Sequence, residues 1–109
     1  MGDGGQCGPE TTLLDGSPVA DDHREIQPDG MQRGYVVLSE AERAKGFVRP
    51  VRRAYVHDAC GKVTTMAVAL AETFARNPKF YGGGFCATCR THFKIDEFMW
   101  YETTERVGS

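Results

Sequence analysis

FCATCRTHF, residues 85–93, places two cysteines and a histidine in a short stretch of a chain that has only four cysteines and three histidines. Cys86 and Cys89 are separated by two residues, and His57 and Cys60 in HDACG (57–61) repeat that spacing. In a zinc knuckle this spacing lets a tight turn present both side chains to one ion, and Gly61 permits the turn. Two such pairs supply the four ligands of a tetrahedral structural site. The sequence therefore predicts one structural Zn²⁺, bound by His57, Cys60, Cys86 and Cys89.

His92 is the alternative nitrogen ligand, because two residues also separate it from Cys89. We expect His57 instead, since it occupies the first position of its knuckle and the turn would place it beside Cys60. His92 lies past the second knuckle and leads into an apolar residue, so we expect a partly buried strand histidine or a group that orients a ligand. Cys7 has no cysteine or histidine nearby and is expected to be an uninvolved thiol.

Outward from the knuckles, the sequence alternates short β-prone runs with one helical pattern. Between the two pairs, Met66, Leu70 and Phe74 recur at a spacing of four, and Asn77-Pro78 ends the pattern, which predicts a helix over 66–76 with its apolar stripe in the core. Gly82-Gly83-Gly84 is expected to form a flexible turn that returns Cys86 to Cys60.

Short strands are predicted on both sides of the knuckles. Residues 35–38 form a β-prone run, after which Ser39 and Glu42 fit the capping box of a short helix that ends before Gly46. Residues 93–100 are typical of a strand pair or bent strand. We therefore predict an α+β fold: a small zinc-ribbon-like domain in which two zinc knuckles bracket one helix, with short flanking β-strands.

The net charge of the chain changes sign at about residue 30. Residues 1–30 contain seven acidic residues and one arginine, a net charge of −6, so residues 31–109 carry +4 of the total of −2. The first 30 residues are also rich in glycine and contain few apolar side chains, so they bury too little surface to offset their ordering entropy. We predict an acidic, disordered tail over 1–30 and a zinc-binding domain over 31–109.

A basic segment, residues 43–53, interleaves arginines and a lysine with apolar residues. Such interleaving can serve a nucleic-acid backbone. The alternative is a solvated strand face on which Val51 and Tyr55 point inward, and the sequence pI of about 5.9 favours it. The candidate contacts to nucleic acid or another partner are Arg49, Arg52, Arg53 and Arg90.

Catalytic interpretations fit the sequence poorly. HDA followed by FCATC has the outline of a zinc deaminase, but Ala59 stands where the proton-transferring glutamate would be, and Phe85 replaces the proline. A thioredoxin-like pair would need its first cysteine at a helix N-terminus. A zinc-bound thiolate is not free to act as a nucleophile beside His92. We therefore expect no enzymatic activity.

The chain resembles a group of small bacteriophage-encoded proteins in which HxxCG, a helix similar to ALAETFARNPKFYGG, FCxxC and HF recur in that order. The resemblance covers about residues 34–109. It implies a phage or prophage origin and supports the zinc site, but it implies no activity. Two positions depart from the pattern: glycine is expected at Arg90 and proline at Lys94.

The predicted function is that of a non-enzymatic, zinc-stabilised binding module that docks on a host or phage protein. The alternative is a nucleic-acid-binding zinc ribbon that uses residues 43–53, with the acidic tail as an intramolecular competitor. No apolar run approaches the ~20 residues that span a bilayer, and the N-terminus lacks the pattern of a secretion signal. The expected compartment is the reducing cytoplasm, where clustered cysteines rarely form disulfides.

Overall fold

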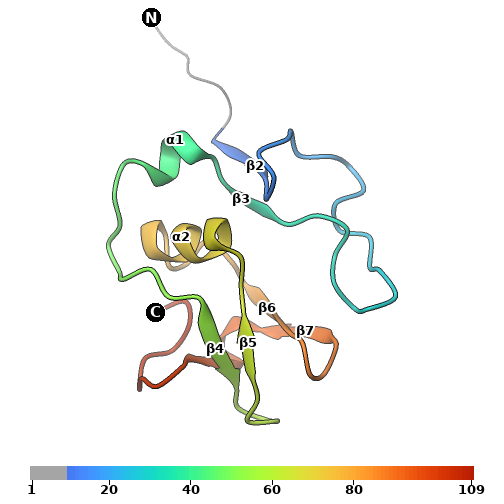
Figure 1. Cartoon of the computed structure of the whole chain (residues 1–109), viewed down its shortest axis with the longest axis vertical. Helices are drawn as coiled ribbons and strands as arrows, with labels where there is room; N and C mark the ends of the chain where they lie inside the picture. The colour runs from blue at the N-terminus through green and yellow to red at the C-terminus, as the bar shows by residue number, and fades with distance from the viewer. Residues whose placement is uncertain (1–9) are drawn as a thin grey trace, which may run out of the picture.

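Short strands arranged around one nine-residue helix make up the architecture (Figure 1). The computed structural model describes residues 10–109. Its elements, in chain order, are β2 (Thr11–Leu13), β3 (Val36–Leu38), α1 (Glu40–Arg43), β4 (Ala54–His57), β5 (Val63–Thr65), α2 (Val68–Arg76), β6 (Gly83–Cys86), β7 (Thr91–Lys94), the 3₁₀ helix η1 (Ile95–Glu97) and β8 (Phe98–Trp100). The strands form three antiparallel sheets, ordered β2-β3, β5-β4-β8 and β6-β7. The small mixed fold of helix and sheet is as predicted.

The predicted strand and capped helix after residue 34 are both present. Strand β3 pairs with β2, and Val37 and Leu38 are buried. The Ser39 side chain accepts a hydrogen bond from the backbone N–H of Glu42, which is the N-terminal cap that the sequence predicts for α1. The Leu38 N–H donates to the Thr73 hydroxyl, so this unit is attached to α2.

The acidic segment contacts the rest of the chain in the part that the structure describes. Strand β2 lies within it, and the loop between β2 and β3 extends along one side of the molecule (Figure 1). Gly30 packs so tightly on the second knuckle that a Cβ there would lie 1.8 Å from the Arg90 carbonyl oxygen. The expected domain boundary at residue 30 stays a prediction, and Cys7 lies outside the described residues.

Helix α2 supplies one wall of the core. Met66, Phe74 and Ala71 are buried in a cluster with Tyr55, Cys86, Phe98, Trp100 and Val107, so the apolar stripe is a core stripe as predicted. The helix begins at Val68 and not at Met66, because the Met66 N–H donates to the Arg53 carbonyl beside strand β5. It ends before Asn77, as expected.

Strand β4 is the centre of the three-stranded sheet and carries His57 at its end. Tyr55 points into the core, as predicted, but Val51 is 42% exposed, so its expected inward orientation is wrong. The reason is that the strand begins only at Ala54, and the inward and outward alternation does not extend back to Val51.

The triple glycine is not a flexible turn: Gly83 and Gly84 lie in strand β6, which pairs with β7. A Cβ at Gly84 would come within 3.1 Å of the Phe98 ring, so close packing and not flexibility requires this glycine. Strand β7 continues through η1 into β8, which is the bend expected near Asp96. In the described part of the chain, no helix is long and apolar enough to cross a membrane.

Candidate metal centre

Two turns bring the four predicted ligands together. His57 ends β4 and Cys60 lies in the turn to β5, while Cys86 ends β6 and Cys89 lies in the turn to β7. His57 and Cys86 are fully buried, Cys60 is half-buried and Cys89 is exposed. The cluster therefore lies at the edge of the core, open to solvent on the side of Cys89.

The two turns have the same backbone geometry. The Gly61 N–H donates to the His57 carbonyl at 2.8 Å, and the Arg90 N–H donates to the Cys86 carbonyl at 2.7 Å. Both donors have a left-handed backbone, with φ of 69° at Gly61 and 59° at Arg90. The left-handed region favours glycine, which gives a physical reason why glycine is the expected residue at position 90.

The spacing of the ligand atoms fits a tetrahedral zinc ion. The Sγ atoms of Cys60 and Cys86 lie 3.6 Å apart, and Cys89 Sγ lies 3.7 Å from His57 Nδ1. With Zn–S of about 2.3 Å and Zn–N of about 2.0 Å, the edges of a tetrahedral site measure about 3.5 to 3.8 Å. A disulfide would need the sulfurs about 2.05 Å apart. All four ligand atoms lie within 4.8 Å of one another, so they are close enough to hold a metal ion.

Glu97 orients the histidine. Its Oε1 lies 3.0 Å from His57 Nε2, on the side of the ring away from the sulfurs. The ring also stacks on Phe93, with centroids 4.1 Å apart, and tilts against Phe98. A carboxylate that accepts from one ring nitrogen leaves the other as an unprotonated ligand, a common arrangement behind zinc-bound histidines. Nδ1 is thus the nitrogen presented to the cluster.

The thiols favour a bound cation. The Lys62 backbone N–H, with smaller contributions from neighbouring side chains, lowers the pKa of Cys60 to about 7. Desolvation, together with the thiols of Cys86 and Cys60, raises the pKa of Cys89 to about 11. One thiolate therefore forms readily, and its charge opposes the next. A divalent cation removes that opposition, so metal binding should release protons from this cluster.

Replacement of Glu97 by glutamine is expected to weaken zinc binding by about 10- to 100-fold, because the His57 ring loses its charged acceptor while all four ligands remain. Competition with a chromophoric zinc chelator measures this affinity. Asp96→Asn is the matched control, because the Asp96 carboxylate is exposed and has no described contact with the cluster. The zinc affinity of this variant should equal that of the unmodified chain. Equal affinities for both variants would contradict the role of Glu97.

Glu97 is the site residue that spacing arguments miss. It is separated from His57 by 40 positions, and it reaches the ring because β8, which begins at the next residue, pairs with β4. His92 lies outside the cluster. Its Nε2 is 2.9 Å from the Tyr35 hydroxyl, so it behaves as the partly buried strand residue that was expected.

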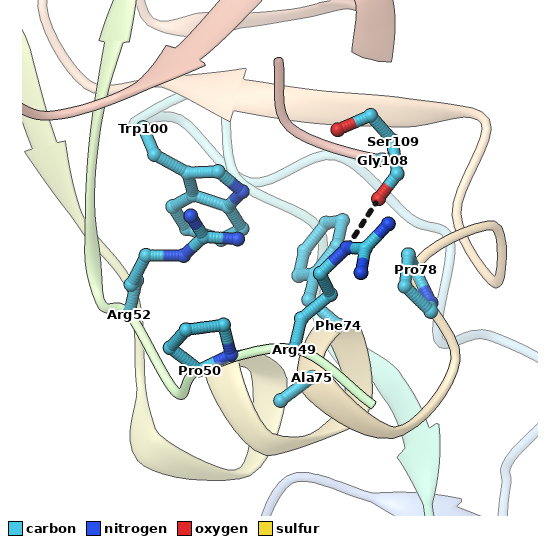
Figure 2. Close-up of a pocket in the computed structure, with 9 residues that line it drawn as sticks. All are labelled: Arg49, Pro50, Arg52, Phe74, Ala75, Pro78, Trp100, Gly108 and Ser109. Carbon is cyan, nitrogen blue, oxygen red and sulfur yellow. Dashed lines mark hydrogen bonds between the residues drawn. The ribbon is translucent and has the colours of Figure 1, made fainter. Parts of the chain in front are cut away.

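The candidate basic contacts mostly have partners within the chain. Arg52 is 2.9 Å from Glu105 and stacks on the Trp100 ring at 4.8 Å, and Arg49 donates to the Ser109 carbonyl across a shallow hollow (Figure 2). Arg53 donates to the Met66 carbonyl. Arg90 lies in the turn between β6 and β7, away from the segment that carries the other three (Figure 1). The four arginines do not form one surface.

No protein-family model, curated protein or solved structure matches the chain.

Proposed function

We propose that this chain is a non-enzymatic protein-binding module of the zinc-ribbon-like class, folded around one structural Zn²⁺. The observation that supports this proposal most strongly is the convergence of His57 Nδ1 and three cysteine Sγ atoms at the ends of two matching turns. The donor set of three thiols and one imidazole is one that structural zinc sites use. The expected setting is a reducing cytoplasm, which keeps these thiols available to the metal.

A structural role is favoured over a catalytic one because the four side chains fill every position of a tetrahedral ion. Catalytic zinc sites keep one position for water or substrate. Cys60 occupies the position that water would need, and Ala59 offers no group to transfer a proton. Chemistry at the metal would require one of these ligands to leave.

A folding role for the metal follows from the small size of the secondary structure. The strands beside the candidate ligands have only three or four residues each, and the main cluster of buried apolar side chains has eight members within residues 10–109. Isolated strands of this length are marginal in water. A metal that links the turn after β4 to the turn after β6 would hold the three-stranded sheet and the β6-β7 hairpin together.

A protein partner is favoured over nucleic acid by the surface of residues 43–53. Besides the paired Arg52, Arg43 lies 2.5 Å from Glu72 and Lys45 lies 2.8 Å from Glu42, so much of the positive charge is neutralised locally. The same segment exposes apolar side chains, with Val48 60% accessible and Phe47 45% accessible. The resemblance to phage-encoded proteins supports a partner among host or phage proteins.

Affinity capture tests this proposal. The zinc-loaded chain, the chelator-treated chain and a Cys86→Ser variant are used as bait in lysates with and without nuclease. We expect a protein that is retained only by the zinc-loaded chain and that survives nuclease treatment.

Direct binding to nucleic acid provides the second arm of the same test. A labelled oligonucleotide at low salt should not bind the full chain, nor a full-length form in which the seven acidic residues of positions 1–30 are replaced by their amides. Nuclease-sensitive capture, or tight oligonucleotide binding that falls steeply with added salt, would establish the alternative and overturn the protein-binding proposal.

A further inference from the structure

A groove separate from the metal cluster lies between the loop that joins β2 to β3 and the exposed side of β6. Its volume is about 650 Å³, within the range that accommodates a drug-sized ligand or a short peptide. The apolar part of its lining is dominated by large side chains: Tyr55, Met66, Leu70, Phe80, Tyr81 and Phe85. None of the four proposed zinc ligands lines it.

One side of the groove is the unpaired edge of a strand. The Ile95 N–H donates to the Gly82 carbonyl, and Gly84 lies opposite Phe93, so these residues pair with β7 through hydrogen bonds. In an antiparallel pair the intervening residues direct their backbone groups to the other side. Gly83 and Phe85 therefore present their backbone groups away from β7.

Gly83 and Phe85 have backbone groups that remain available for hydrogen bonds in the described part of the chain. The Phe85 carbonyl accepts from the Tyr55 hydroxyl, which leaves the Phe85 N–H without a described backbone partner. Within residues 10–109, no backbone group outside β7 pairs with the Gly83 N–H or carbonyl. The edge thus offers two donors and one acceptor, spaced as in a strand, beside an apolar groove.

Gly82 has no folding requirement that explains a glycine. Its φ is outside the left-handed region, and a Cβ there would meet nothing within 4 Å. Gly84 differs, because its close contact with Phe98 requires a glycine. Glycine in or beside a strand often marks the close approach of a ligand or another backbone. Gly82 keeps the floor of the groove free of side chains.

Besides three tyrosines, the titratable side chains of the groove are an arginine and two histidines. Arg24, His23 and His92 line it, and no carboxylate does. His23 Nδ1 lies 2.7 Å from the Ala20 carbonyl, and the Tyr35 hydroxyl occupies His92 Nε2, so one nitrogen of each imidazole stays available. The Arg24 side chain has no described ion-pair partner and is exposed. Burial lowers the pKa of His92 and so favours its neutral form, which makes Arg24 the cation that this lining offers to a carboxylate.

We propose that an extended peptide segment of a partner protein, with alternating acidic and apolar side chains, adds to the free edge of β6 and fills this groove. Strand addition supplies main-chain hydrogen bonds from Gly83 and Phe85, while alternate side chains enter the aromatic groove or face Arg24. This inference rests on the proposed protein-binding function and assigns it a surface other than residues 43–53.

Selection from a displayed library of random decapeptides, with the zinc-loaded full chain as bait, supplies the probe. We expect enriched peptides with carboxylates at alternate positions and no proline at their centre. Gly82→Trp, which fills the groove, and Arg24→Glu, which reverses its charge, should each raise the dissociation constant of the best peptide by about tenfold or more. Arg106→Glu is the control, because it makes the same charge change at an exposed residue outside the groove and should leave the constant unchanged.

Amide hydrogen exchange provides a readout specific to strand addition. In the free chain the Gly83 and Phe85 amides should exchange much faster than the Gly84 amide, which is paired to β7. Bound peptide should slow the first two by about tenfold or more and leave Gly84 unchanged. The circular dichroism spectra and zinc contents of the variants confirm that they are folded.

Failure to enrich any peptide, enrichment of basic peptides, or binding that leaves the Gly83 and Phe85 amides unprotected would each overturn the inference. A partner captured in a zinc-dependent manner by both the original chain and Gly82→Trp would overturn it too, while the protein-binding function would stand. Loss of zinc-dependent capture by the original chain would instead contradict the proposed function itself.

Discussion

Removal of zinc with a strong chelator is expected to unfold the domain. Apparent binding free energies of structural zinc in zinc-finger peptides are on the order of 10 kcal/mol, and in small domains this free energy contributes directly to folding. The cluster of buried apolar side chains around the two turns has only eight members in the described part of the chain, so it is expected to retain too little stability once the turns are released from each other. The metal is thus expected to account for most of the stability.

Circular dichroism measures this effect through helix α2, Val68–Arg76, whose signal should disappear after chelation. Addition of Zn²⁺ under reducing conditions should restore the signal, whereas Mg²⁺ should not, because hard cations prefer oxygen ligands. A chelated chain that keeps its helix and its cooperative thermal transition would show that the core is sufficient without metal.

Replacement of His57 is expected to remove nearly all of the bound zinc, whereas replacement of His92 is expected to leave the zinc content unchanged. His57→Ala removes a ligand that is 1% exposed and leaves the Glu97 carboxylate without its partner, so the purified variant should contain almost no zinc. His92→Ala should keep one zinc per chain, because this histidine contacts Tyr35 and not the cluster. Loss of the hydrogen bond between His92 and Tyr35 should lower the free energy of unfolding by about 1 kcal/mol.

Elemental analysis of the two purified variants, combined with thermal unfolding, checks this contrast. Each variant removes one imidazole, so the comparison controls for the change in composition. Zinc retained by His57→Ala and lost by His92→Ala would show that the second histidine, and not the first, is the ligand.

The two turns that carry the candidate ligands could be predicted because their geometry is local. Two residues between ligands, followed by a left-handed position, specify a turn with little help from the rest of the chain, and Gly61 supplies that position in sequence. The capped start of α1 and the end of α2 before Asn77 are local in the same way. Spacing and turn chemistry suffice for such features.

Features set by tertiary packing could not be predicted. Glu97 reaches His57 through the pairing of β8 with β4, which no spacing rule reveals. The triple glycine has the composition of a loop, yet Gly84 is in a strand because Phe98 packs against its backbone. Met66 has the spacing of a helical residue, but its N–H is taken by Arg53. In each case a contact distant in sequence overrides the local pattern.

X-ray absorption spectroscopy at the zinc edge tests the central claim most directly, because it counts the ligand atoms around the metal in the intact chain. We expect one zinc per chain with three sulfurs at about 2.3 Å and one nitrogen at about 2.0 Å, and no coordinated water. A spectrum with fewer than three sulfurs, or with an oxygen ligand from solvent, would contradict a closed structural site formed by His57, Cys60, Cys86 and Cys89.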